Sequence, residues 1–411
     1  MKHKKNILFL SLSNNTNIED DESIYGSVIG YLVKNDYKVY TISPIERRFK
    51  EKTSIHKKGN YVVLKVRTGN IQKTNIIEKG VSTLLIEHKF IYAIKKYLKN
   101  IKFDMVLYST PPITFSNVVK FIKKRDNAVT YLMLKDIFPQ NAVDIKLLSK
   151  RNPIYYFFRK KEKELYTISD KIGCMSEKNI NYVLDNNSYL EKDKIELFPN
   201  TITPCDAKKR NIDLNIEYRK KYNIPIDSRV FIYGGNLGKP QGIEFVIECL
   251  ESAKKYSNVY FVICGRGTEF YKVEKYMKKN NPRNLLLLNG LEKEEYSRFL
   301  NIGDIGLIFL DSKFTIPNFP SRTLSYMQKG IPILACVDKN TDIGSIVEKN
   351  GFGWSCLSDD VTYFEKKMKE INLLDNNEIE MMGKKGYEFL LKNYNSKNAF
   401  KRLEEVIKNE S

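Results

Sequence analysis

A glycine-rich segment in the second half of the chain has the composition of an anion-binding loop. It reads Tyr233-Gly234-Gly235-Asn236-Leu237-Gly238-Lys239-Pro240-Gln241-Gly242 and lies between an apolar run and an amphipathic stretch. Glycines let backbone N–H groups approach an anion, and the start of a helix adds the positive end of its dipole. Lys239 can supply a point charge to a phosphate. The spacing fits neither the dinucleotide fingerprint nor the P-loop, so a structural turn is the alternative.

Two other segments place an arginine at or shortly before an expected helix start. Pro320 and Ser321 predict a helix start, and Arg322 in the first turn would oppose the helix dipole unless an anion shares the site. Arg266 follows an apolar run in Cys264-Gly265-Arg266-Gly267 and could face a phosphate or a base. The alternative for Arg266 is a tight strand-to-helix turn. Both arginines are therefore candidate contacts to a phosphorylated ligand.

The first half of the chain supplies a candidate acid–base group. Lys135-Asp136-Ile137-Phe138-Pro139-Gln140 follows an apolar run, and a carboxylate at the end of a strand can act as general base on an acceptor hydroxyl if its pKa suits. A turn or capping aspartate is the alternative for Asp136. Ser109-Thr110-Pro111-Pro112 also follows an apolar run and could line the same site or form a turn.

The segment Arg151–Tyr166 combines aromatic and basic residues. Tyr155, Tyr156, Phe157 and Phe158 are followed by Arg159 and Lys160, a mixture that suits an anionic lipid interface. The alternative is a helix with its aromatic residues in the core and its lysines in water. We expect the aromatic residues to be core residues and the basic ones to face a membrane.

Alternating strand-like and helical segments predict the elements that position these residues. Such alternation is typical of parallel sheets with helices on both faces, and open sheets of this kind bind ligands at the carboxyl ends of their strands. Pro199-Asn200-Thr201-Ile202-Thr203-Pro204 and the charged stretch after it predict a domain boundary, after which the alternation restarts. We therefore expect an α/β protein with two Rossmann-like, doubly wound domains, residues 1–200 and 201–392, facing an interdomain cleft that holds the site.

Composition limits the classes of partner and compartment. The chain has 411 residues and a formal net charge of +20, which suits nucleic acid, an anionic membrane or phosphorylated substrates, or reflects coding bias alone. No nucleic-acid recognition motif supports the first of these. Six cysteines without C-x-x-C spacing and three ungrouped histidines indicate a reducing compartment and no metal site. Without a signal or membrane-spanning segment, we expect a cytoplasmic protein that touches the inner face of the cell membrane peripherally.

The segments taken together, in their order, resemble retaining glycosyltransferases of family four, which have the GT-B fold. The similarity is greatest to the branch that adds amino sugars to lipid-linked O-antigen or capsule precursors. It extends over nearly the whole chain and is carried by Gly234–Gly238, Pro320-Ser321-Arg322, Tyr326-Met327 with Gly330-Ile331-Pro332, Asp136-Ile137-Phe138-Pro139 and Pro199-Asn200.

The resemblance implies a nucleotide-sugar, UDP-linked in our expectation, bound by the second domain and a polyprenyl-diphosphate-linked saccharide bound by the first. The diphosphate would be held by Gly235, Asn236, Gly238, Lys239, Ser321 and Arg322. The base and ribose would lie near Arg266, Leu291 and Ser325, and residues 393–411 would form a helix crossing back to the first domain. Asp136 would be catalytic, and Lys135, Arg159 and Lys160 would face the acceptor or the membrane. Neither a cofactor nor a metal is implied.

The chain departs from the family pattern at several of these positions. Pro317 and Ser325 stand where a Glu-x7-Glu pair is frequent, Asn236 and Gln241 replace a flanking arginine and lysine, and Lys135 replaces a histidine. Two alternatives follow. A sugar-nucleotide 2-epimerase shares the two-domain fold but needs acid–base carboxylates and histidines at its site. A non-catalytic partner would keep the fold without a working donor site.

Overall fold

The computed structural model describes residues 4–12, 16–72, 74–206 and 210–409. Its contacts divide the chain into two compact α/β units, residues 1–203 with 395–411, and residues 204–394. The chain therefore leaves the N-terminal unit after Thr203 and returns to it at Asn395, a few residues beyond the expected boundaries at 200 and 392.

The N-terminal unit is built on an eight-stranded sheet of order β3-β4-β2-β1-β5-β6-β7-β8. All neighbouring strands pair in parallel except β3 and β4, which form an antiparallel edge that we did not expect. The strands are β1 (Asn6–Leu10), β2 (Lys38–Glu46), β3 (Ser54–Lys58), β4 (Tyr61–Thr68), β5 (Met105–Ser109), β6 (Val129–Leu134), β7 (Lys171–Cys174) and β8 (Ile195–Leu197). The helices are α1 (Gly26–Lys34), α2 (Ile76–Tyr97), α3 (Ser116–Asp126), α4 (Gln140–Asp144), α5 (Pro153–Ile168), α6 (Glu177–Asp185) and α15 (Ser396–Asn409), with short helices η1 (Arg47–Phe49) and η2 (Lys192–Lys194).

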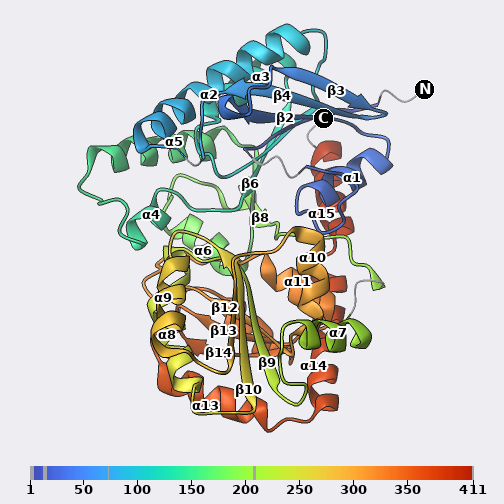
Figure 1. The fold of residues 1–411 in the computed structure, drawn as a ribbon. Helices are drawn as coiled ribbons and strands as arrows, with labels where there is room; N and C mark the ends of the chain where they lie inside the picture. Colours follow the sequence, from blue (N-terminus) through green and yellow to red (C-terminus); the bar gives the residue numbers. More distant parts are fainter. Residues whose placement is uncertain (1–3, 13–15, 73, 207–209, 410–411) are drawn as a thin grey trace. The chain divides into compact units, whose positions relative to one another are not determined.

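Helices cover both faces of this sheet, so its central strands are buried along their whole length. Alternate residues such as Ile7 and Phe9 pack against α1 and α15, where Phe400 and Leu403 complete one core. Helices α2, α3 and α5 pack in series on the other side (Figure 1). The last helix of the chain thus belongs to the N-terminal unit.

The C-terminal unit has a six-stranded parallel sheet of order β11-β10-β9-β12-β13-β14. Its strands are β9 (Arg229–Asn236), β10 (Val259–Arg266), β11 (Leu285–Leu288), β12 (Ile305–Phe309), β13 (Ile333–Val337) and β14 (Gly353–Leu357). Its helices are α7 (Ile212–Lys221), α8 (Ile243–Ala253), α9 (Phe270–Asn280), α10 (Lys293–Phe299), α11 (Arg322–Lys329), α12 (Ile343–Lys349), α13 (Val361–Asn372) and α14 (Asn376–Asn393), with short helices η4 (Lys239–Gln241) and η5 (Leu300–Ile302).

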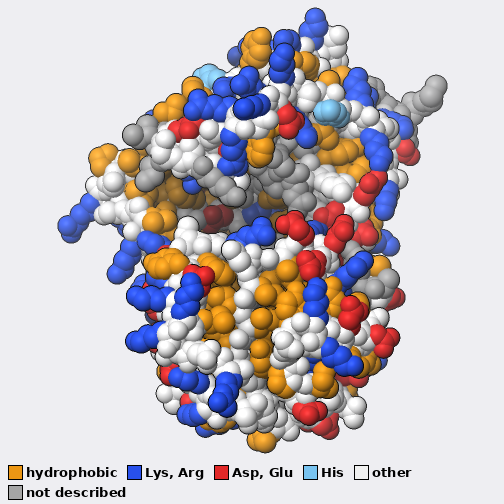
Figure 2. Space-filling model, in the orientation of Figure 1, with side chains coloured by type: hydrophobic (Ala, Val, Ile, Leu, Met, Phe, Trp, Pro, Cys, Tyr) orange, Lys and Arg blue, Asp and Glu red, His pale blue; other side chains and the backbone are white. Residues whose placement is uncertain are grey.

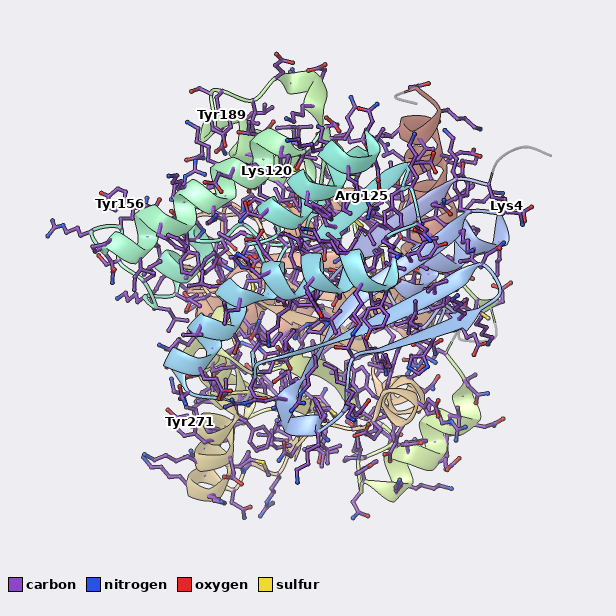
Figure 3. The ribbon with its side chains drawn as sticks, turned by 90° about the horizontal axis from the view of Figure 1, so that it is seen from above. Lys4, Lys120, Arg125, Tyr156, Tyr189 and Tyr271 are labelled. Carbon is purple, nitrogen blue, oxygen red and sulfur yellow. The ribbon has the colours of Figure 1, made fainter. Side chains whose placement is uncertain are left out.

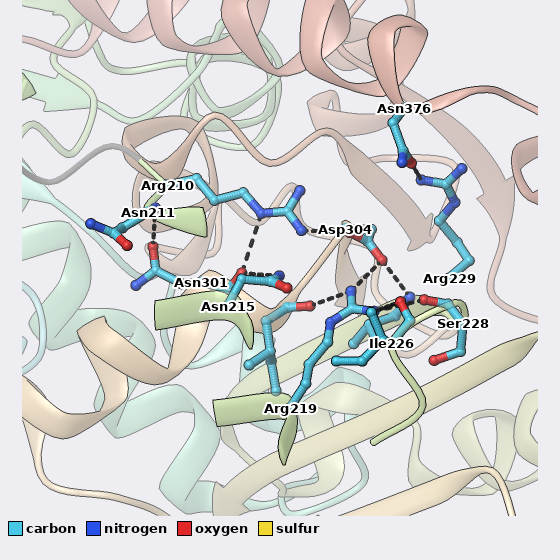
Figure 4. A network of polar contacts seen from close by, with 12 residues as sticks. Arg210, Asn211, Asn215, Arg219, Ile226, Ser228, Arg229, Asn301, Asp304 and Asn376 are labelled. Carbon is cyan, nitrogen blue, oxygen red and sulfur yellow. Dashed lines mark hydrogen bonds and ion pairs between the residues drawn. The ribbon is translucent and has the colours of Figure 1, made fainter. Parts of the chain in front are cut away.

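A buried carboxylate ties the beginning of the C-terminal unit to this sheet. Asp304, directly before β12, accepts hydrogen bonds from Arg210 at 2.6 Å, from Arg219 at 2.8 Å and from the Val230 N–H at 2.7 Å (Figure 4). Burial alone would raise the pKa of Asp304, but the two guanidinium groups outweigh burial and hold this pKa below its ordinary value. The network fixes the segment that follows the domain boundary.

Candidate functional site

The glycine-rich segment continues strand β9 and then turns at the carboxyl edge of the C-terminal sheet. Gly235 and Asn236 are still paired in register with Gly265 and Arg266 of β10. The chain then passes through η4 into α8, so its backbone leaves the sheet at the edge where parallel sheets bind ligands.

Two glycines of this segment are required by what packs against them. A Cβ on Gly234 would lie 1.6 Å from the hydroxyl of Tyr296. Gly235 has φ +125°, in the region that favours glycine, and a Cβ there would lie 3.3 Å from the Arg322 guanidinium. The strand end is therefore in close contact with side chains from α10 and α11.

Arg322 is a cation that the described residues leave without an acidic partner. It begins α11, and its guanidinium carbon lies 4.2 Å from the centre of the Tyr233 ring. Its Nη1 atom is buried and finds no hydrogen-bond partner within the described chain. A desolvated donor without a partner is costly, so a ligand anion beside Gly235 would satisfy it.

Two further phenols lie close to Arg322. Tyr326, fully buried, donates to the Ile232 and Leu307 carbonyls and accepts from the Gly234 N–H at 3.3 Å. The Tyr296 hydroxyl is buried and unpartnered among the described residues, and burial raises its pKa well above the ordinary value. Neutral tyrosines around Arg322 supply no charge to neutralise it.

Gln241 holds the glycine-rich turn in shape, a role that we did not predict from the sequence. Its side-chain oxygen accepts from the Asn236 amide at 2.9 Å and from the Gly238 N–H at 3.0 Å. The predicted donors Asn236 and Gly238 therefore already make hydrogen bonds inside the turn. Asn236 keeps one amide hydrogen for a ligand.

The remaining predicted diphosphate residues lie on the same two segments. Lys239 is exposed on η4, and Ser321 is exposed directly before α11, where its hydroxyl makes no capping bond. The two segments adjoin, because Gly235 lies beside the Arg322 guanidinium. The structure thus brings the glycine-rich turn and the start of α11 together.

The predicted base and ribose residues are only partly connected. Arg266 donates to the Asn289 carbonyl at 3.0 Å and packs against Gly290. Both contacts lie just before Leu291 in the sequence. Leu291 is half-buried at the same edge, beyond β11. Ser325 lies on α11, one turn after Arg322, and no contact among the described residues joins it to Arg266 or Leu291.

In the N-terminal unit, Thr110 organises the candidate acid–base segment. It directly follows β5, and its hydroxyl accepts from the Lys135 and Asp136 N–H groups at 3.0 and 3.1 Å. The same hydroxyl donates to the Asp136 carbonyl at 3.0 Å. The loop after β6 is thereby fixed to the loop after β5.

Asp136 has the acidity expected of a general base near neutral pH. It is half-buried, and burial raises its pKa to about 6, against a hydrogen bond from Asn141 that lowers it. Asn141, on α4, donates to one carboxylate oxygen at 2.6 Å. The Asn141 side-chain oxygen is buried without a partner among the described residues. The hydrogen bond from Asn141 therefore holds the Asp136 carboxylate in one orientation.

Lys135 lies in the same loop but points elsewhere. Its ammonium donates to the Phe198 carbonyl at 3.2 Å and lies 5.2 Å from the centre of the Phe198 ring. Burial lowers the pKa of Lys135 to about 7, since no carboxylate pairs with it among the described residues. A lysine of this kind gains and loses its proton close to neutral pH.

The exposure of helix α5 bears on two predictions, a core position for its aromatic residues and a membrane contact for its basic residues. Tyr156 and Phe157 are 64% and 42% exposed, so the prediction that the aromatic residues of this segment lie in the core is wrong for both. Arg159 donates to the Asn186 carbonyl and to Asn187 at 2.8 and 2.7 Å, whereas Lys160 is exposed. No contact among the described residues joins Arg159 or Lys160 to Asp136.

Comparison with known proteins bears on the C-terminal unit first. Residues 215–389 match the family of glycosyl transferases group 1. A Pseudomonas aeruginosa protein named probable glycosyltransferase WbjE is 25% identical over 315 residues, which cover 74% of each chain. An Escherichia coli K12 protein named for colanic acid biosynthesis, glycosyl transferase WcaI, is 20% identical over 252 residues, 60% of each chain.

Solved structures bear on the fold of the whole chain. Sucrose-phosphate synthase from Thermosynechococcus elongatus superposes with a TM-score of 0.77 and 14% identity, covering 98% of both chains. An Escherichia coli trehalose-6-phosphate structure with bound UDP-2-fluoro glucose superposes with a TM-score of 0.73 and 10% identity, covering 98% of this chain and 99% of that chain. Residues 215–389 thus match the model of glycosyl transferases group 1, and the whole chain has the GT-B fold of two Rossmann-like domains.

Proposed function

We propose that this protein transfers a sugar, with retention of configuration, from a nucleotide diphosphate sugar to a lipid-linked saccharide. The observation that carries the proposal is the half-buried Arg322, whose guanidinium lies beside Gly235 and whose buried Nη1 atom has no hydrogen-bond partner among the described residues. A diphosphate is the ligand that this donor group and the glycine-rich turn suit best.

In this proposal the donor site stabilises the leaving group. For retention, the acceptor hydroxyl oxygen forms its bond to the anomeric carbon on the same face from which the nucleoside diphosphate departs, and the hydroxyl proton passes to Asp136 or to the leaving diphosphate. Negative charge then accumulates on the departing diphosphate, where Arg322 and Lys239 would neutralise it and Asn236 and Ser321 would donate hydrogen bonds. These groups supply the charge, so we expect turnover without an added metal or other cofactor.

Asp136 would act on the acceptor. With a pKa of about 6, most of its carboxylate is ionised at neutral pH and can orient the acceptor hydroxyl or take its proton. Lys135, whose pKa is about 7, would supply a positive charge to a phosphorylated acceptor.

The substrate classes are inferred from the relatives and from the chemistry of the chain. The name of WcaI, which mentions colanic acid biosynthesis, supports a role in polysaccharide synthesis, and that of WbjE supports glycosyl transfer. We propose O-antigen or capsule as the polysaccharide. The UDP-2-fluoro glucose of the related fold makes UDP the first nucleotide to test. We further propose an N-acetylated amino sugar as the donor sugar, a polyprenyl diphosphate as the lipid, and action at the cytoplasmic face of the cell membrane.

A donor screen tests this proposal. The protein is incubated with UDP-, GDP- and dTDP-sugars and with membranes that carry lipid-linked saccharides, and transfer of label to lipid is measured. We expect transfer from one nucleotide class and a strong loss with Asp136→Asn. Conversion of UDP-N-acetylglucosamine to an isomer without any acceptor would indicate the epimerase instead. No calorimetric heat with UDP, GDP or dTDP would indicate a non-catalytic partner.

A further inference from the structure

Helix α2 carries an apolar stripe on its solvent face. Val81, Leu84, Leu85 and Tyr92 are 52%, 45%, 46% and 66% exposed, and their spacing places them on one side of the helix together with the exposed His88. The opposite side of α2, with Ile86 and Phe90, is buried in the core. The helix is therefore apolar on two sides, and the described residues cover only one of them.

A second group of exposed apolar side chains lies at the start of α5 and just before it. Leu147, Ile154, Tyr156 and Phe157 are 63%, 53%, 64% and 42% exposed. Figure 3 shows Tyr156 at the outer end of α5, directed away from the unit. Apolar groups concentrated in this way indicate an interaction surface.

The two groups belong to one layer of helices. Helix α3 lies between α2 and α5, because Asn117 bonds to Glu87 of α2 at 2.6 Å and Ser116 bonds to Glu164 of α5 at 3.3 Å. In Figure 2, hydrophobic and basic side chains intermingle over the part of the N-terminal unit where Figure 1 draws α2 and α5. We call the solvent side of α2, α3 and α5, with Leu147, the helical face.

Charge on the helical face has one sign. Its exposed charged side chains are lysines: Lys95, Lys96, Lys120, Lys124, Lys160 and Lys163. The acidic residues of the same helices are buried or half-buried and bonded within the unit: Glu78, Glu87, Asp126, Glu162 and Glu164. Five lysines, Lys120, Lys123, Lys124, Lys160 and Lys163, line one hollow between α3 and α5, together with Glu164, which is paired with Lys161.

The combination of exposed apolar side chains and lysines indicates what kind of partner binds the helical face. A second copy of the chain would bring the same lysines against each other, which like charges oppose. A partner that accepts apolar side chains and also attracts a row of lysines is a bilayer with anionic headgroups. Within the described residues, no helix is long and apolar enough to cross a bilayer, so contact would be made from one side.

We infer that the helical face docks on an anionic membrane, with the apolar side chains of α2 and α5 among the acyl chains and the lysines among the headgroups. The inference rests on the proposed lipid-linked acceptor for its purpose, because it would hold the enzyme at the surface where that acceptor lies. Binding itself requires neither donor nor acceptor and is measured independently.

Co-sedimentation of the full chain with lipid vesicles tests the inference. We expect binding to vesicles of phosphatidylcholine mixed with phosphatidylglycerol and at least tenfold weaker binding to phosphatidylcholine alone. Two variants separate the contributions. One combines Leu84→Ser, Leu85→Ser, Tyr156→Ser and Phe157→Ser, and the other replaces Lys120, Lys124, Lys160 and Lys163 by Gln. Each should weaken binding at least tenfold.

Matched controls come from exposed residues of the C-terminal unit. One control combines Leu373→Ser and Met381→Ser, and the other replaces Lys275, Lys279, Lys366 and Lys384 by Gln, with the same loss of charge. Both controls should bind as the unaltered protein does, and thermal unfolding and UDP affinity should be unchanged in all four variants. Failure of the unaltered protein to bind anionic vesicles, or equal losses in the controls, would overturn the inference. UDP binding that persists in that case would leave the proposed sugar transfer standing.

Discussion

Asp136 and Lys135 are adjacent in the chain, and burial shifts the pKa of each toward neutral pH from opposite sides. Burial raises the pKa of the carboxyl to about 6 and lowers that of the ammonium to about 7. Burial disfavours the charged form of each side chain, and the pKa shift is the result of that cost. Such paired shifts are frequent where groups exchange protons with a substrate.

Replacing Asp136 by Asn should separate acceptor chemistry from donor binding. The amide cannot accept the acceptor proton, so we expect kcat to fall by about 10²–10⁴-fold. UDP affinity should be unchanged, because Asp136 lies outside the C-terminal unit. In the unaltered protein kcat should decline as pH falls through about 6, where Asp136 takes up a proton. A variant with unchanged kcat, or a profile flat between pH 5 and about 7, would contradict this role.

The same substitution should stabilise the fold. The pKa of Asp136 is higher in the folded than in the unfolded protein, so ionisation of its carboxylate destabilises the fold. This destabilisation grows as pH rises from about 4 to about 6 and is constant above that range. Asn removes the charge and can still accept from Asn141. The free energy of unfolding at pH 7 should therefore rise by about 1–3 kcal/mol, and by little at pH 4. Urea titrations at the two pH values measure this, and equal effects at both would count against a buried carboxylate.

The sequence alone predicts Asp136 and Arg322 as candidate site residues, because each breaks a local expectation. A carboxylate after an apolar run and a cation in the first turn of a helix are visible without a structure. Thr110, Gln241 and Tyr296 carry no such signal, since their roles depend on partners that the fold brings together, such as Gly234 beside Tyr296. A threonine before two prolines or a glutamine in a glycine-rich turn is equally compatible with a loop that binds no ligand.

At the scale of elements, the Asp304 network should carry much of the stability of the C-terminal unit. Asp304→Ala leaves Arg210 and Arg219 without their carboxylate, and a broken buried pair costs about 3–5 kcal/mol. Trp354, the single tryptophan, lies in β14 and reports on this unit. Its fluorescence should show unfolding at a lower urea concentration in Asp304→Ala than in the exposed control Asp227→Ala.

The pH dependence of that network has the opposite sign to that of Asp136. The folded pKa of Asp304 is lowered, so its stabilisation is fully present above the unfolded pKa of about 4 and is lost as pH falls through the folded value. The difference in stability between Asp304→Ala and the unaltered protein should therefore shrink in acid. A constant difference down to about pH 2 would contradict the ion pairs.

Helix α15 should stabilise the N-terminal unit without affecting the other. Leu403 is fully buried against that core, and Leu→Ala changes at such sites cost about 2–5 kcal/mol. We expect circular dichroism to show an earlier loss of helix in Leu403→Ala, while the Trp354 transition stays in place. The exposed control Lys401→Ala should shift neither signal. A common shift of both signals would mean that the two units unfold as one.

The elements that sequence reasoning missed are those with weak hydrophobic periodicity. Strand β3, Ser54-Ile55-His56-Lys57-Lys58, has a single apolar residue because it is an exposed edge, so nothing distinguishes it from a loop. The aromatic residues of α5 were assigned to the core because hydrophobic side chains usually are. Hydrophobic periodicity cannot distinguish a helix face that packs in the core from an apolar face that is exposed to solvent.

For the whole molecule, the repeated alternation of strands and helices was sufficient to predict two Rossmann-like domains. The return of the last helix to the N-terminal unit came from the family resemblance, because a polar amphipathic tail does not by itself show which core it covers. The exposure of an apolar, lysine-lined helical face required coordinates. The net charge of +20 is visible in the sequence, but the exposure of a group of lysines beside apolar side chains on that face is not.

The proposed function depends above all on whether the C-terminal unit recognises a diphosphate through Arg322 and Lys239. Calorimetry measures the affinities for UDP and for uridine in the unaltered protein and in two double variants. The first variant combines Arg322→Ala with Lys239→Ala. The control combines Arg283→Ala with Lys384→Ala, which removes the same charge from exposed positions. We predict that the preference for UDP over uridine falls by about 100-fold or more in the first pair, equivalent to about 3 kcal/mol, and stays unchanged in the control. A first pair that keeps the full preference for UDP would contradict the proposed donor site.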